Sequence, residues 1–144
     1  MMFEKVIRLA LRLSVSAGFL SAVADRFGMW HYHVAWGTWI NFKAYLFQLV
    51  PWLPAKLVAP LAILATIAEL VLSLFLIIGW KTNFFAVLSG ALLLLFALAM
   101  TFSTGIKTAF DASVFAAATA AFAITVNKTR WLELDSFLEK HKQK

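Results

Sequence analysis

The chain contains no cysteine. It therefore forms no disulfide, carries no thiol chemistry of its own and offers no thiolate to a zinc ion or an iron–sulfur cluster. Charge is also scarce, because 14% of the 144 residues are Asp, Glu, Lys or Arg whereas 62% are apolar. The mean hydropathy is +0.84, a value that soluble domains rarely approach. The composition predicts a membrane protein.

Motifs for common chemistries are missing as well. The sequence has no glycine-rich nucleotide loop, no zinc-ligand spacing and no Ser/His/Asp arrangement, and we predict no metal site. His31 and His33 with Asp25 offer at most a weak set of metal ligands. The net charge of +6 comes mostly from basic residues at the ends of apolar segments, which indicates anionic headgroups as partners and excludes a nucleic-acid interface.

Long apolar runs dominate what is present. Leu57 to Trp80 forms a helix of about 36 Å, longer than the ~30 Å hydrocarbon core of a bilayer. Pro60 is expected in the first turn of this helix, where a missing N–H costs little. Together the runs predict an all-α bundle of four transmembrane helices in a membrane domain of residues 1–128, at about 6–24, 57–79, 83–104 and 110–127. A charged tail of residues 129–144 follows.

Three segments of this layout leave room for interpretation. The first 24 residues have some features of a signal peptide, but the short, serine-diluted apolar run favours a retained helix. Between the first two spans, Thr38 to Val50 has the spacing of a short aromatic interfacial helix, and an irregular aromatic cap is the alternative. In the tail, four apolar residues could form a surface helix on the membrane: Trp131, Leu134, Phe137 and Leu138.

Four crossings place both termini on one side of the membrane. The basic residues on that side are Lys5, Arg8, Arg12, Lys81, Lys128, Arg130, Lys140, Lys142 and Lys144. The opposite side holds only Arg26, Lys43, Lys56 and Lys107. The positive-inside rule therefore predicts a multi-pass protein of the bacterial inner membrane with both termini cytoplasmic.

Charges inside the predicted spans need partners, because an ionised group is costly at that depth. Glu69 lies near the middle of the second span and Arg12 lies within the first, at depths that differ by roughly 6 Å. We predict an Arg12–Glu69 pair. It is either a fixed ion pair that selects one packing of the helices, or a polar site for a quinone headgroup, a proton or a small anion. Arg8, nearer the helix end, is expected to snorkel to lipid headgroups.

Two further acidic positions have simpler interpretations. Thr108 and Asp111 have the spacing of a capping box at the start of the fourth span, so helix capping is favoured over a secondary site. The Asp25-Arg26 pair, at the outer end of the first span, is expected to be a solvated border of the membrane.

The order and spacing of several segments resemble the DoxX family of small bacterial integral membrane proteins. The resemblance extends to about residue 127 and rests on Leu9–Phe27 (LALRLSVSAGFLSAVADRF), Phe42 and Tyr45 before Pro51-Trp52-Leu53-Pro54, Ala68-Glu69, Gly79-Trp80-Lys81-Thr82, Gly105-Ile106-Lys107, Asp111 and Ser113-Val114-Phe115. Arg12 and Glu69 match positions where the family commonly has these residue types. The glycine-rich ending of many members is absent here, so no role of that ending carries over.

This resemblance implies a function by analogy only. The family is related to the DoxD subunit of a thiosulfate:quinone oxidoreductase, which implies an accessory subunit of a quinone-linked membrane oxidoreductase or redox-stress complex. A quinone cofactor, a redox protein partner and a homo-oligomer would fit, and any enzymatic role would be that of a subunit. The alternatives are a permease for a small solute or proton, and a ligand-free scaffold or assembly factor.

Overall fold

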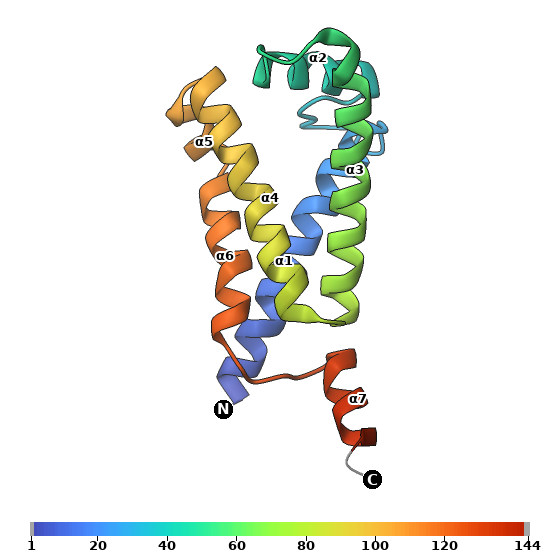
Figure 1. Cartoon of the computed structure of the whole chain (residues 1–144), viewed down its shortest axis with the longest axis vertical. Coiled ribbons are helices and arrows are strands. Elements are labelled where there is room, and N and C mark those ends of the chain that lie inside the picture. Colours follow the sequence, from blue (N-terminus) through green and yellow to red (C-terminus); the bar gives the residue numbers. More distant parts are fainter. Residues whose placement is uncertain (1, 143–144) are drawn as a thin grey trace.

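A computed structural model describes residues 2–142 of the chain, with the side chains of residues 2–138. This part of the chain is mostly helical and contains no strand, which confirms the all-α part of the predicted fold class (Figure 1). The helices are α1 (Met2–Arg26), α2 (Trp39–Leu49), α3 (Ala55–Ile78), α4 (Thr82–Ser103), α5 (Ile106–Asp111), α6 (Val114–Val126) and α7 (Leu134–Lys142).

Three of these helices, α1, α3 and α4, are long and apolar enough to cross a membrane. Their length and composition indicate a multi-pass protein in a lipid bilayer. The fourth candidate, α6, has 13 residues and a length of about 20 Å, less than the ~30 Å core. Three spans are therefore supported by helix length, and a fourth complete span is not.

The predicted helix at 110–127 is interrupted. One helix, α5, ends at Asp111, and the next, α6, begins at Val114. Between them Ser113 has φ 54° and ψ 24°, in the left-handed region, which ends the ladder of helical hydrogen bonds. Serine and alanine residues at the break gave no sequence signal, because the usual breakers glycine and proline are absent there.

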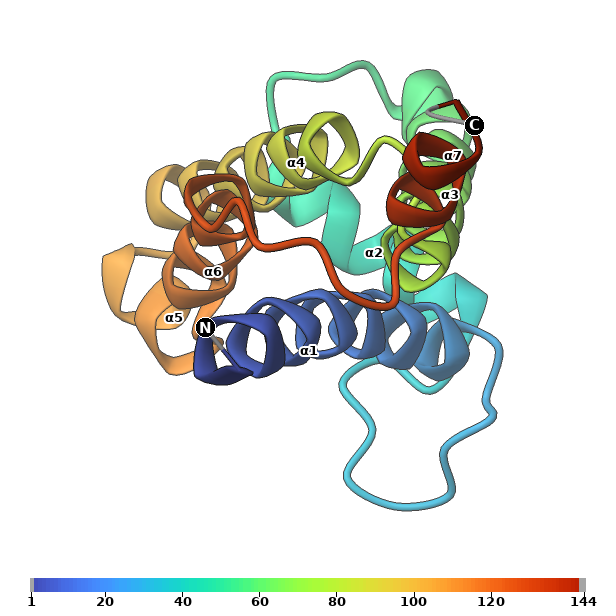
Figure 2. The same ribbon diagram turned by 90° about the horizontal axis from the view of Figure 1, so that it is seen from below.

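The bundle is held together by two close helix pairs. Along α4 and α6 the backbones approach closely at Gly90, where a Cβ atom would lie 2.6 Å from the ring of Phe122. Along α1 and α3, the side chains of Val15, Phe19 and Leu72 belong to the main core cluster. Figure 2, seen along the long axis, shows the helices arranged around this core.

One end of the bundle carries α2, and we call it the α2 end. This helix lies across the long axis (Figure 1) and confirms a helix close to the predicted range. Its N-cap is Thr38, whose Oγ1 accepts a hydrogen bond from Asn41 N at 3.2 Å. Phe42 and Leu46 are buried against the first turns of α3.

The other end holds the start of α1 and the tail, and we call it the tail end (Figure 1). Residues 127–135, which we call the strap, cross this end (Figure 2). Within the strap, Glu133 is completely buried. The predicted tail helix forms as α7, but it extends away from the bundle and does not lie across its end (Figures 1 and 2).

Helix limits also differ in detail from the prediction. The first helix begins at Met2, four residues earlier than expected. The helix α3 begins at Ala55, so Pro60 lies inside it, beyond the first turn where a missing N–H is free of cost.

Candidate functional site

A buried ion pair joins α1 and α3 near the α2 end. Arg26 is 2% exposed and Glu69 is 1% exposed. The Nη2 group of Arg26 donates to Glu69 Oε1 at 2.7 Å, and its Nη1 group donates to Thr66 Oγ1 at 2.7 Å. The predicted partner of Glu69, Arg12, was therefore wrong, and so was the view of Asp25-Arg26 as a solvated border.

The wrong pairing has a geometric cause. Counting residues from the tail end assumes that the start of α1 and the end of α3 lie at the same level. Instead, α1 begins at Met2, and its first turns extend beyond the end of α3 (Figure 1). Arg12 consequently lies beside the last turn of α3, where its Nε donates to Leu76 O at 2.8 Å. Leu76 is seven residues, or about 10 Å, beyond Glu69.

Aromatic rings enclose the Arg26 side chain. The guanidinium carbon lies 3.9 Å from the ring centroid of Phe42 and 5.4 Å from that of Trp36. Such cation–π contacts stabilise an arginine that has lost its hydration. Together with Glu69, they replace the water that the guanidinium group of Arg26 has lost.

The neighbouring carboxylate, Asp25, holds the chain that supplies Trp36. It is 6% exposed and accepts backbone N–H groups from Trp36 at 2.7 Å, and from Ala35 and Gly37 at 3.3 Å each. These charge-assisted bonds fix Trp36 beside Arg26. Among the described residues no cluster of three metal-ligating side chains occurs, so the weak ligand set of Asp25 with the histidines does not assemble.

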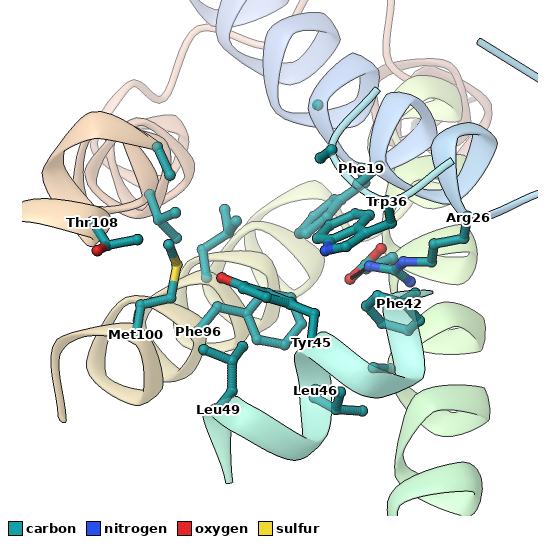
Figure 3. Close-up of a pocket in the computed structure, with 18 of the residues that line it drawn as sticks. Phe19, Arg26, Trp36, Phe42, Tyr45, Leu46, Leu49, Phe96, Met100 and Thr108 are labelled. Carbon is teal, nitrogen blue, oxygen red and sulfur yellow. Dashed lines mark hydrogen bonds and ion pairs between the residues drawn. The ribbon is translucent and has the colours of Figure 1, made fainter. Parts of the chain in front are cut away.

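A cavity of about 780 Å³ lies next to this ion pair (Figure 3). All helices except α7 contribute to it, and most of its wall is apolar or aromatic. The main lining residues are Gly18, Phe19, Ala22, Arg26, Trp36, Phe42, Tyr45, Leu46, Leu49, Glu69, Leu93, Phe96, Met100, Thr108 and Ala117. Its size is in the range of sites that bind small organic molecules.

Two polar atoms of the ion pair have no hydrogen-bond partner, and we call them unused. Within the described part of the chain, Arg26 Nε and Glu69 Oε2 are buried and have no hydrogen-bond partner. A buried donor or acceptor without a partner costs roughly 1–3 kcal/mol, so such atoms usually meet a water molecule or a ligand. Both residues line the cavity, and the two atoms themselves are covered, so a ligand in the cavity reaches them only after a shift of a neighbouring side chain.

Another polar group faces the cavity from α2. Figure 3 shows the Tyr45 hydroxyl directed into the cavity, away from the ion pair. Burial raises the pKa of Tyr45 above its usual value of 10, so this hydroxyl stays protonated and can donate a hydrogen bond.

The predicted capping pair of Thr108 and Asp111 does not cap a helix. Gly105 precedes α5 and Ser113 precedes α6, and neither cap involves these side chains. Asp111 instead lies exposed at the end of α5, where Lys107 Nζ donates to its Oδ2 at 2.5 Å. Thr108 donates to Thr104 O at 3.2 Å and contributes to the cavity wall.

A second buried cluster closes the tail end, and it consists of Arg8, Arg12 and Glu133. Arg8 Nε donates to Glu133 Oε1 at 2.5 Å, Arg12 Nη1 lies 3.5 Å from the same oxygen, and Thr82 Oγ1 donates to Glu133 Oε2 at 3.0 Å. Arg8 is 1% exposed, so the prediction that it snorkels to headgroups was wrong. The partner that makes its burial tolerable comes from the strap, which sequence spacing could not place there.

The same two arginines bind the carboxyl ends of neighbouring helices. Arg12 donates to Leu76 O at 2.8 Å and to Ile77 O at 3.0 Å, at the end of α3. Arg8 Nη1 donates to Ile124 O at the end of α6 and to Asn127 O. Terminal carbonyls lack helical partners and carry partial negative charge, so cations stabilise them. This second cluster is structural, and Arg12 belongs to it.

Comparison of the chain with protein-family models, curated proteins and solved structures finds no match. The resemblance to the DoxX family therefore stays a prediction from the residues. The site is interpreted below from its own geometry.

Proposed function

We propose that the protein binds a quinone in the cavity beside Arg26 and Glu69, and acts as an accessory subunit of a quinone-linked membrane oxidoreductase or redox-stress complex. One observation carries the proposal: a largely apolar cavity of about 780 Å³ ends at a buried ion pair with one unused donor and one unused acceptor.

The two unused atoms match the two redox forms of a quinone headgroup. In the oxidised form, a quinone carbonyl oxygen can accept a hydrogen bond from Arg26 Nε. In the reduced form, a quinol hydroxyl can donate a hydrogen bond to Glu69 Oε2. Aromatic rings of Trp36, Phe42 and Phe96 line the cavity and favour a flat ring between them. The apolar wall suits the first units of the isoprenoid chain.

The proposed location follows from the charges that remain exposed to the surroundings. With Arg8, Arg12 and Arg26 buried in the protein, the tail end still has more basic residues than the α2 end. We therefore place both termini in the cytoplasm of a bacterium, with the α2 end on the outer face of the inner membrane. The chain has no cysteine and therefore no thiol that could exchange electrons with the quinone. In this proposal a redox protein partner supplies that group.

A permease is less well supported than a binding subunit. A transport path needs openings on both sides of the membrane. At the tail end, Arg8, Arg12 and Glu133 are each at most 1% exposed, and residues of the strap bind both arginines. This arrangement favours a cavity with access from the α2 end or from the bilayer.

Lipid extraction and mass spectrometry test the proposal. The wild-type protein, purified in mild detergent, is expected to retain quinone, and Glu69→Gln is expected to lose most of it because the anion beside Arg26 is removed. Asp111→Asn is the control, since Asp111 is exposed and outside the cavity wall. Only phospholipid in all three folded samples would rule out retained quinone and favour a scaffold.

A further inference from the structure

We infer that the loop of residues 27–37, which we call the aromatic loop, is an anchor that lies in the interface of the bilayer surrounding the helices. This inference does not depend on quinone binding. It assigns the loop a partner of definite chemistry, the boundary between lipid headgroups and acyl chains.

The base of the aromatic loop is fixed to the end of α1. Gly28 N donates to Asp25 O at 3.1 Å, and Trp36 N donates to the Asp25 carboxylate at 2.7 Å. Gly28 and Gly37, near the two ends of the aromatic loop, both have φ 69° and make the sharp turns at which the loop leaves and returns. The loop therefore leaves and returns at one point.

The tip exposes apolar and aromatic side chains together with the imidazoles of His31 and His33. Met29 is 70% exposed, Trp30 51% and Tyr32 82%. No residue from Phe27 to Phe42 is aspartate, glutamate, lysine or arginine. A tip in water would be expected to carry charge, whereas uncharged aromatic side chains are enriched where lipid headgroups meet acyl chains.

The direction of the loop favours lipid over a soluble protein. Viewed along the bundle axis, the loop projects sideways from α1 (Figure 2). Trp30 Nε1 donates to Ser21 O at 3.1 Å, so the polar atom of the indole is satisfied within the protein. On the same helix Leu13 and Leu20 are 46% and 39% exposed, as expected for a surface that meets lipid. The loop thus continues a lipid-facing surface, whereas a soluble partner would approach the end of the bundle.

The backbone of the aromatic loop limits how deeply the loop can enter the bilayer. An irregular loop leaves N–H and C=O groups without helical partners, and these groups need water or headgroups nearby. The tip is therefore expected at the level of the headgroups and the first carbons of the acyl chains, above the hydrocarbon core.

Site-directed spin labelling in liposomes of mixed zwitterionic and anionic phospholipid tests the inference. Because the natural chain has no cysteine, Tyr32→Cys gives a single labelling site on the full-length protein. Lys107→Cys, on a side chain that is 85% exposed, reports water, and Leu64→Cys, 64% exposed on α3, reports the hydrocarbon core. Power saturation with oxygen and with a water-soluble nickel complex gives the depth of each label.

The label at position 32 is expected to lie between the two references, with higher relative oxygen accessibility than position 107 and lower than position 64. Accessibility to nickel equal to that of position 107 would overturn the inference and indicate a loop free in water. Dipolar broadening between labels at position 32 of two copies would overturn it in favour of a contact between copies.

Discussion

Buried charges define the molecule at the scale of single residues. Glu69 and Arg26 pair at the cavity, and Glu133 pairs with Arg8 and Arg12 at the tail end. Removal of one partner from a buried pair leaves the other charge uncompensated, which typically costs 3–5 kcal/mol. The two clusters differ in one respect: only the pair at the cavity has unused polar atoms among the described residues, apart from a lone hydroxyl of Ser89.

Glu133→Gln is expected to lower the free energy of unfolding by about 3–5 kcal/mol, because two buried guanidinium groups lose their anion. Unfolding by SDS in mixed micelles measures the change. Asp111→Asn, which breaks the exposed pair with Lys107, should change the free energy of unfolding by at most about 0.5 kcal/mol. Equal effects of the two substitutions would contradict a buried role for Glu133.

A second residue-scale prediction concerns glycine. Gly79→Ala should destabilise the protein by more than about 1 kcal/mol, because φ is 76° and the new Cβ atom would lie 2.6 Å from Arg12 Nη2 and 2.7 Å from Glu133 Cα. Gly18→Ala is the matched control. It lies in a helix with nothing within 4 Å, and alanine there should be neutral or stabilising by about 0.5–1 kcal/mol. Thermal unfolding in detergent separates the two results.

At the scale of elements, the strap is the feature that sequence patterns describe least well. Asp135 accepts N–H groups of Lys81 at 2.8 Å and Thr82 at 2.9 Å, and so satisfies the first turn of α4 from a distant part of the chain. Asp135 N in turn donates to Gly79 O at 3.1 Å. The sequence predicted a charged tail that could form a surface helix on the membrane, and only the folded structure shows these contacts.

Truncation tests the strap directly. A chain ending at Val126 should assemble poorly or unfold at a much lower SDS fraction, because Arg8 and Arg12 lose Glu133 and α4 loses its cap. A chain ending at Leu138 keeps both carboxylates and should resemble the wild type. Size-exclusion chromatography and SDS titration compare them, and equal stability of both truncations would contradict a structural role for the strap.

The sequence predicted elements better than the contacts between them. Apolar length alone located α1, α3 and α4, and helical spacing located α2. The break at Ser113 was missed because neither a glycine nor a proline marks it. Glu69 was singled out correctly as a buried charge in need of a partner. Its partner Arg26 was missed because the offset of α1 relative to α3 depends on tertiary packing, which no local pattern encodes.

At the scale of the whole molecule, the two ends of the bundle have different roles. The tail end is closed by arginines, helix carbonyls and the strap, whereas the α2 end contains a cavity of about 780 Å³. Tyr45 entered the sequence analysis only through the resemblance, and no pattern placed it in one cavity with Trp36 and Phe96, since aromatic residues are frequent throughout the chain. A cavity depends on what several helices leave unfilled, and single-sequence patterns carry no information about it.

Binding of a short-chain ubiquinone analogue to the protein in nanodiscs is the most direct test of the proposed site. Quenching of tryptophan fluorescence gives the affinity, because Trp36 lines the cavity. Gly18→Leu places a large side chain in the cavity without changing a charge, and Ala17→Leu puts the same side chain on the neighbouring exposed position as a control.

Saturable quenching is expected for the wild type and for Ala17→Leu, with affinity reduced about tenfold or more in Gly18→Leu, since overpacking typically costs 1–3 kcal/mol. Equal affinity in all three proteins, or only the non-saturable quenching that arises from partition into lipid, would contradict a quinone site in this cavity.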